Sequence, residues 1–129
     1  MIVDSSALVA IFNKEQDGPL FARKIDSAAS VSISAATYLE TAIVLERDRD
    51  PVLSARFDDL ILDLEMVIEP VTAVQARIAR QAYRDYGKGS GHPANLNYGD
   101  CFSYALARDK REPLLYKGDE FTHTDLRPA

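Results

Sequence analysis

The chain is poor in the residues that build disulfides and zinc sites. Its 129 residues include one cysteine and two histidines, and no tryptophan. The single cysteine, Cys101, excludes an internal disulfide and any metal site that needs several thiolates. Because Cys101 falls in an apolar helical pattern, we expect it to be a core residue rather than a nucleophile.

Long apolar runs are also absent. No stretch approaches the roughly 18 apolar residues of a membrane span, and Asp4 interrupts the first apolar run before a signal-peptide core could form. The hydrophobic fraction of 47% is typical of a globular protein, and the length suits one hydrophobic core. The sequence therefore predicts a single cytoplasmic domain over residues 1–129 with no membrane segment.

The balance of charge is acidic. A net charge of −5 argues against a protein that coats nucleic acid by overall charge. If four carboxylates gather around a divalent cation, however, the rest of the chain carries a formal charge of −1. Charge alone therefore leaves a nucleic-acid substrate open.

Short apolar or β-branched runs alternate with helical patterns along the whole chain. We expect strands at residues 1–3, 30–34, 66–68 and 113–116, each separated from the next by two helical segments. Thr72 and Gln75 have the spacing of a capping box, residues 47–51 form a charged connection, and residues 87–97 form a long flexible loop. Because strands joined by helical crossovers pair in parallel, the sequence predicts a three-layer α/β/α sandwich with a central, mostly parallel sheet.

Four acidic residues fall where this topology would bring them to one edge of the sheet. Asp4 ends the first strand and Asp119 follows the fourth, while Glu40 lies on the helix that leaves the second strand. Asp100 lies among apolar residues in the first turn of a later helix, which residues 97–99 can cap. Since the carboxyl ends of parallel strands share one edge, we expect a shared pocket. For Asp4 alone, a helix cap is an equally good interpretation, and a lone Glu40 would more often be solvated.

Gathered carboxylates repel one another, and a divalent cation removes that repulsion. Mg²⁺ or Mn²⁺ prefers oxygen ligands and is usually held by one or two carboxylates with waters and a substrate phosphate. Such an ion activates water and stabilises charge on a phosphodiester. The chain has no GxxxxGK[ST] loop, and His92 and His123 lie in a loop and in the short polar tail, so a serine nucleophile lacks a base. The pattern favours metal-assisted cleavage of phosphodiesters.

Four blocks of the chain resemble PIN-domain proteins, and most closely the VapC toxins of bacterial type II toxin–antitoxin modules. They are residues 1–8 (MIVDSSAL), 39–40 (LE), 92–107 (HPANLNYGDCFSYALA) and 115–121 (LYKGDEF). The resemblance covers essentially the whole chain in the right order. It implies a PIN fold and a Mg²⁺-dependent endoribonuclease that cuts structured RNA such as tRNA or rRNA. It also implies neutralisation by a VapB-type antitoxin, and a homodimer.

The resemblance also implies roles for the four acids. Asp4 and Asp100 match the principal metal ligands of the family, and Glu40 completes the acidic pocket. Asp119 takes the fourth acidic place. Many relatives have Gly-Asn-Asp-Phe where this chain has Gly-Asp-Glu-Phe at 118–121, so Glu120 is the alternative, and we favour Asp119.

Several other side chains near these acids are secondary candidates. Ser5 stands where threonine is more usual and keeps the hydroxyl, and Ser6 is the other candidate to hydrogen-bond the metal shell. Either serine can also cap the first helix, which would free Asp4 for the metal. Lys88, Arg84 and His92 are weaker candidates for contact with the RNA backbone.

Two other functions and a surface for the partner also follow from residues of this sequence. A phospho-receiver domain needs an acceptor aspartate at the end of the third strand, where this chain has Glu69. A PIN-like subunit that binds a DNA-binding antitoxin and acts in transcriptional autorepression would keep the fold without catalysis, but the presence of all four acids favours the nuclease. The first helices offer apolar residues for a groove that could accept an antitoxin helix, although an ordinary core position is at least as good an interpretation for each: Leu8, Phe12, Phe21, Ile25 and Ile43.

Overall fold

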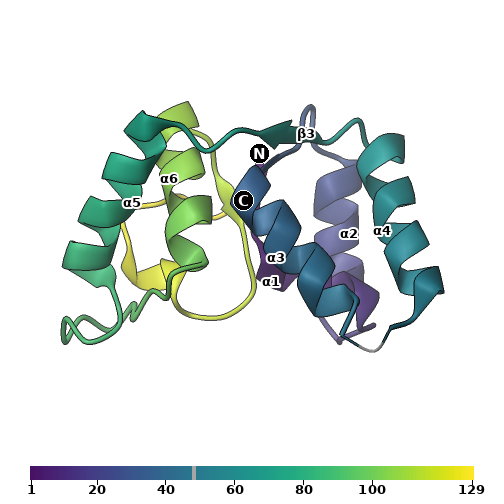
Figure 1. Ribbon diagram of the computed structural model, residues 1–129, viewed down its shortest axis with the longest axis horizontal. Coiled ribbons are helices and arrows are strands. Elements are labelled where there is room, and N and C mark those ends of the chain that lie inside the picture. Colours follow the sequence, from purple (N-terminus) through teal and green to yellow (C-terminus); the bar gives the residue numbers. More distant parts are fainter. Residues whose placement is uncertain (48) are drawn as a thin grey trace.

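The computed structural model describes residues 1–47 and 49–129, and it forms one parallel sheet flanked by helices (Figure 1). The strands are β1 (Ile2–Val3), β2 (Ser32–Ser34), β3 (Val67–Glu69) and β4 (Leu114–Leu115), in the spatial order β3-β2-β1-β4. Between them lie α1 (Ser5–Phe12) and α2 (Gly18–Asp26), then α3 (Ala35–Leu45) and α4 (Pro51–Asp63), then α5 (Ala73–Tyr86) and α6 (Asp100–Lys110). Asp48, in the expected charged connection, lies outside the described residues.

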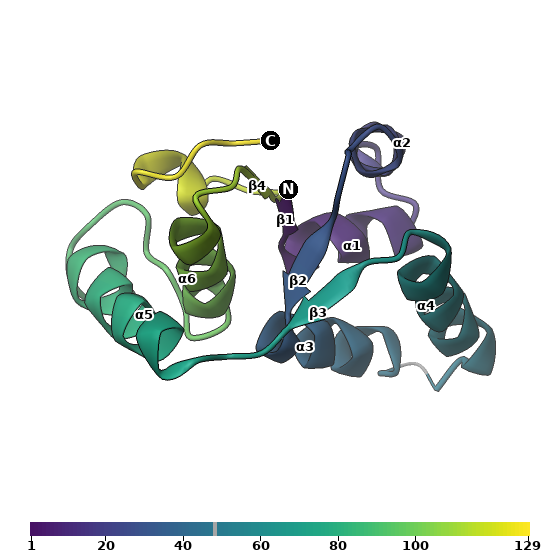
Figure 2. The same cartoon turned by 90° about the horizontal axis from the view of Figure 1, so that it is seen from above.

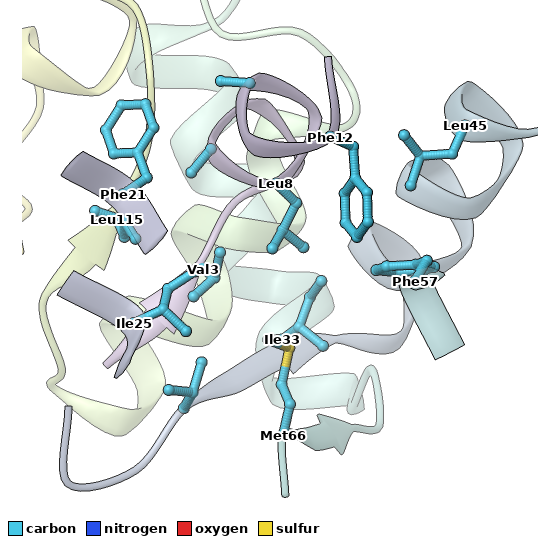
Figure 3. Close-up of a cluster of buried hydrophobic side chains, with 13 residues drawn as sticks. Val3, Leu8, Phe12, Phe21, Ile25, Ile33, Leu45, Phe57, Met66 and Leu115 are labelled. Carbon is cyan, nitrogen blue, oxygen red and sulfur yellow. The ribbon is translucent and has the colours of Figure 1, made fainter. Parts of the chain in front are cut away.

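The sheet separates two hydrophobic clusters, because successive residues of a strand point to opposite faces. Ile2 and Leu114 pack with side chains of α5 and α6, whereas Val3 and Leu115 pack on the opposite face with α1 to α4 (Figure 3). Seen from above, α5 and α6 lie on one side of the strands and α1, α2 and α4 on the other (Figure 2). The predicted three-layer α/β/α sandwich and its parallel sheet are confirmed.

Residues 87–97 form a connection without helix or strand, as their composition predicts, and backbone hydrogen bonds tie its two ends together. The backbone N–H of Lys88 donates to the carbonyl of Leu96 at 2.8 Å, and the N–H of Leu96 donates to the carbonyl of Tyr86 at 2.9 Å. Leu96 and Ala94 are buried against α5 and α6. Ala94 and Leu96 therefore anchor the end of the loop in the core on this side of the sheet, while most of residues 88–93 are exposed. Cys101 is a core residue there, as predicted.

The C-terminal tail is also part of the fold. After a 3₁₀ turn, Phe121–His123, the chain returns to β4, where the N–H of Leu114 donates to Arg127 and the N–H of Ala129 donates to Leu114, both at 2.9 Å. These bonds occupy the outer edge of β4, which would otherwise present unpaired backbone groups.

The predicted antitoxin groove on the first helices is wrong. Leu8, Phe12, Phe21 and Ile25 are all less than one-tenth exposed and belong to the core, and only Ile43 is exposed. A domain of this size needs these large side chains to fill the space between α1, α2 and the sheet.

None of the described helices is long and apolar enough to cross a membrane.

Candidate active site at the carboxyl edge of the sheet

Asp4 is the N-cap of α1 and is buried. Its backbone is extended, and its Oδ2 accepts from the N–H of Ser6 at 2.9 Å and from the Ser6 hydroxyl at 2.6 Å. The expectation that Ser5 or Ser6 would cap the helix is therefore wrong, because Asp4 itself does so. Within the described residues its other oxygen, Oδ1, makes no hydrogen bond, so Asp4 can cap α1 and still act as a ligand.

The two serines after Asp4 have different roles. The Ser6 hydroxyl donates to Asp4 and accepts from the backbone N–H of Lys117 at 3.0 Å, just beyond β4. The Ser5 hydroxyl instead donates to Oε2 of Glu40 at 3.3 Å. Ser6 thus joins the ends of β1 and β4, and Ser5 joins α1 to α3.

Asp100 is oriented by a reciprocal cap at the start of α6. Its Oδ2 accepts from the N–H of Asn97 at 2.7 Å, and its own N–H donates to Oδ1 of Asn97 at 3.0 Å. This pair satisfies two backbone donors at once and fixes the side-chain rotamer of Asp100. The Oδ1 atom of Asp100 has no hydrogen-bond partner among the described residues.

Gly99 makes room for Glu40. A Cβ atom at Gly99 would lie 2.5 Å and 2.8 Å from the two carboxylate oxygens of Glu40, closer than non-bonded atoms approach. The backbone at Gly99 is ordinary right-handed helix, so glycine is needed here for space and not for its conformational freedom. The missing side chain lets Glu40 of α3 reach the first turn of α6, next to Asp100.

Three of the four predicted acids lie close enough to affect one another's ionisation. The pKa of Asp100 is raised to about 7, chiefly by burial and further by the charges of Asp4, Glu120 and Glu40, while the hydrogen bond from Asn97 acts to lower it. The pKa of Glu40 is raised by burial and then by the charge of Asp4, and lowered by the bond from Ser5. Carboxylates in contact with water and far apart would not shift one another in this way.

The sequence favours Asp119 as the fourth acid, whereas the structure favours Glu120. Both Asp119 and Glu120 are exposed, but only Glu120 is among the charges that raise the pKa of Asp100. The carbonyl of Asp119 accepts from the N–H of Thr122 at 3.1 Å and begins the 3₁₀ turn. The role of Asp119 stays a prediction. The position of Glu120, close enough to act on Asp100, favours Glu120 as the fourth acid.

The sequence placed Asn97 among the residues that can cap α6, and the structure confirms that role, but the parts played by Gly99 and by the backbone of Lys117 were not predicted. Only Asn97 had a usable signal, since an asparagine three residues before an aspartate at a helix start has capping-box spacing. The candidate RNA contacts remain predictions. Arg84 and Lys88 are exposed, whereas the ring of His92 packs edge-on against Tyr86 with centroids 4.9 Å apart, and its Nδ1 accepts from Ala94 at 3.2 Å.

The donor set fits a hard divalent cation. No group of three or more His, Cys, Asp or Glu side chains in the described part of the chain is already arranged to hold a metal. Mg²⁺ does not require such a group, because it commonly takes one or two carboxylates and keeps several waters. Asp4 and Asp100 each keep one carboxylate oxygen uncommitted, and a bound cation would offset the mutual repulsion that raises the pKa of Asp100 and Glu40.

The raised pKa of Asp100 predicts how the stability of the metal-free protein depends on pH. Its folded pKa of about 7 lies above the ordinary aspartate pKa of 3.8, so between these values the folded state binds more protons than the unfolded state. Stability therefore falls as the pH rises through this window and levels off above it. We expect the midpoint of thermal unfolding to be a few degrees lower at about pH 8 than at about pH 6.

Two comparisons check this pH dependence by calorimetry or circular dichroism. Asp100→Asn should lose most of it, because the amide does not titrate and can still accept from Asn97. Saturating Mg²⁺ should raise the midpoint mainly at the higher pH, where the ligands are ionised. A midpoint that rises steadily from pH 6 to pH 8 in the metal-free protein would contradict the assignment.

Comparison with known proteins gives consistent matches over the whole chain. The model of the PIN domain matches residues 1–126. Ribonuclease VapC28 of Mycobacterium tuberculosis is 56% identical over 129 residues, which cover 100% of this chain and 97% of that protein. These two matches span Asp4, Glu40 and Asp100.

Solved structures show the same fold at lower identity. The crystal structure of Mycobacterium tuberculosis VapC20, described as a sarcin–ricin loop cleaving toxin, has a TM-score of 0.73 at 21% identity and covers 98% of both chains. A toxin–antitoxin complex from Klebsiella pneumoniae has a TM-score of 0.71 at 15% identity, covering 96% of this chain and 92% of that one.

Proposed function

This chain belongs to the PIN-domain family and, within it, to the VapC ribonucleases, and we propose that it is the Mg²⁺-dependent toxin of a type II toxin–antitoxin module that cuts structured RNA. Mn²⁺ can replace Mg²⁺ in this proposal, because both prefer oxygen ligands. The observation that carries the proposal is the meeting of Asp4, Glu40 and Asp100, from distant parts of a ribonuclease-family chain, at one edge of the sheet.

The relatives support the finer parts of the proposal. VapC20 is described as cleaving the sarcin–ricin loop, which is a structured RNA, so rRNA or tRNA is the substrate class proposed here. The Klebsiella pneumoniae chain was solved in a toxin–antitoxin complex, which supports a VapB-type antitoxin as the partner. We keep the homodimer as a proposal that rests on family resemblance.

The side chains of the site have separable tasks. Asp4 and Asp100 would hold a cation through their uncommitted oxygens, while Ser6 and Asn97 keep the two carboxylates from rotating away. When bound, the cation lowers the pKa of a coordinated water and offsets the charge that develops on the phosphate. Glu40, whose pKa is raised, is placed to accept the proton of the attacking water at Oε1, which no other described residue contacts by a hydrogen bond.

Cleavage of purified RNA tests the proposal directly. The isolated protein, free of any antitoxin, should cut total tRNA or rRNA at few sites in Mg²⁺ or Mn²⁺. It should stop in EDTA and recover when the ion is restored. Sequencing the new 5′ ends after a brief expression of the protein in cells identifies the target and the cleaved bond. If no cellular RNA is cut and overexpression is harmless, the protein is instead a binding subunit of a repressor complex.

A further inference from the structure

Tyr98 is an exposed aromatic residue beside the acidic site. Its side chain is 79% exposed, the largest exposure of any large hydrophobic residue in the described chain, although it precedes Asp100 by only two positions. Its ring meets that of Phe102 edge-on, with centroids 4.9 Å apart and planes at 83°. The Tyr98 ring is therefore supported by Phe102 on one side, and most of its surface is exposed.

Tyr98 and Phe102 form a ridge between two hollows. The first, of about 360 Å³, lies between α3 and α6 and is lined by Leu39, Glu40, Arg47 and Gly99 in addition to the ridge. The second, of about 460 Å³, lies between α5 and α6, which run side by side (Figure 1), and its walls include Arg80 and Tyr83. The ridge therefore separates the catalytic carboxylate Glu40 from the exposed surface of α5.

That surface of α5 carries a basic stripe. Arg77, Arg80 and Arg84 are exposed and follow one another at spacings of three and four residues, which places them on one face of the helix. Among the described residues none of these arginines takes part in an ion pair, whereas Arg108, Lys110 and Lys117 do. In a chain with a net charge of −5, this stripe is a local site for polyanions.

We propose that Tyr98 stacks on an unpaired base next to the scissile phosphodiester of the RNA, while the arginine stripe of α5 binds the adjoining phosphates. This inference rests on the proposed function and names the surface that presents the RNA to its acids. An exposed aromatic face beside guanidinium groups is the usual platform for single-stranded nucleic acid, and structured RNA offers such bases in loops and bulges.

Charge and continuity favour RNA over a protein partner at this surface. A protein partner that buried Tyr98 and Phe102 would also have to neutralise three neighbouring arginines. An RNA strand does both through its bases and its phosphates. Tyr98 and Glu40 line the same first hollow, so a strand whose base is held at Tyr98 lies next to the acidic site.

Binding and kinetics with substituted tyrosines test the platform. The parent for binding is Asp100→Asn, which leaves the RNA intact, and the probe is a stem–loop RNA with 2-aminopurine in its loop. In the Asp100→Asn background, Tyr98→Ala should weaken RNA binding about tenfold. In the otherwise wild-type enzyme, it should raise KM for tRNA or rRNA by a similar factor. Tyr98→Phe should leave the affinity and KM near the values of the proteins without a Tyr98 substitution. Tyr98→Leu retains apolar area without a π face and should behave like alanine. Quenching of 2-aminopurine on binding should be lost in the alanine and leucine variants only.

The arginine stripe is tested by the salt dependence of the same binding. Arg80→Gln should lower the slope of log K against log salt by about 0.7, the value for one phosphate contact with a single strand. The matched control is Arg23→Gln, an exposed arginine of α2 on the opposite side of the sheet, which should leave the slope unchanged. Leu62→Ala, on the exposed face of α4, controls for loss of a surface apolar group.

Three outcomes overturn the inference. One is a leucine variant that binds like the parent, since apolar contact alone would then suffice. Another is an unchanged affinity in every Tyr98 variant, and the third is a change in oligomeric state or antitoxin binding with RNA affinity intact, which would assign the surface to a protein partner. If the wild type binds RNA through Tyr98 but cuts none, the inference stands and the proposed catalytic activity fails.

Discussion

Replacing Asp100 with asparagine is expected to lower the rate of RNA cleavage about a thousandfold, which corresponds to ~4 kcal/mol of transition-state stabilisation. The substitution is nearly isosteric. The amide oxygen can still accept from the N–H of Asn97, so the start of α6 stays capped. What is lost is one anionic ligand at the point where Asp4, Glu40 and Glu120 converge.

Measurement of single-turnover cleavage and of thermal unfolding separates this effect from misfolding. The variant should unfold at the same temperature as the wild type or higher above pH 7, because a half-buried carboxylate surrounded by like charges no longer ionises. Asp119→Asn and Glu120→Gln provide an internal comparison. If Glu120 is the fourth acid, its substitution lowers the rate and that of Asp119 does not. Full activity in Asp100→Asn would remove the basis for the assignment of the site.

Substitution of Gly99 with alanine is expected to lower kcat between tenfold and a hundredfold while the protein stays folded. The new methyl group would overlap the carboxylate of Glu40, so this flexible side chain must leave its present position beside the first turn of α6. The backbone of Gly99 is right-handed helical, so alanine fits it and can stabilise the helix slightly. A displacement of about an ångström at a reacting group is enough for losses of this size.

A double-mutant cycle identifies Glu40 as the residue through which Gly99 acts. Glu40→Ala alone should reduce kcat, and adding Gly99→Ala to it should have little further effect, because no carboxylate remains to be displaced. If the two losses multiply instead, the alanine acts through another part of the site. The midpoint of thermal unfolding of all three variants should remain within a few degrees of the wild type.

The fold could be predicted from the sequence because its signals are local and repeated. Each strand is a short apolar run followed by a helical period, and parallel pairing follows from the connections. The same reasoning brought Asp4, Glu40 and Asp100 to one edge, since each lies at or soon after a strand end or at a helix start. The alternation of Ile2 and Val3 between the two clusters follows from the period-two geometry of a strand.

What could not be predicted depends on contacts between side chains far apart in the chain. Whether Phe12 and Phe21 are core or surface is decided by how closely α1 and α2 approach the sheet, and composition does not specify that distance. The choice between Asp119 and Glu120 depends on a turn at Gly118, whose φ is +103°. Gly99 lacks any local signal, because its reason is the carboxylate of Glu40, which comes from α3.

The hydrogen bonds of Ser6 have a consequence for the order in which the site comes into being during synthesis. Asp4 leaves the ribosome among the first residues, yet the N–H that fixes its serine partner belongs to Lys117, 111 positions after Ser6. β1 likewise obtains one of its two neighbours only from β4. Contacts so distant in sequence form late in folding. A nascent chain that stops before β4 therefore carries Asp4 and Glu40 without this geometry, and the site can assemble only after Lys117 has been translated.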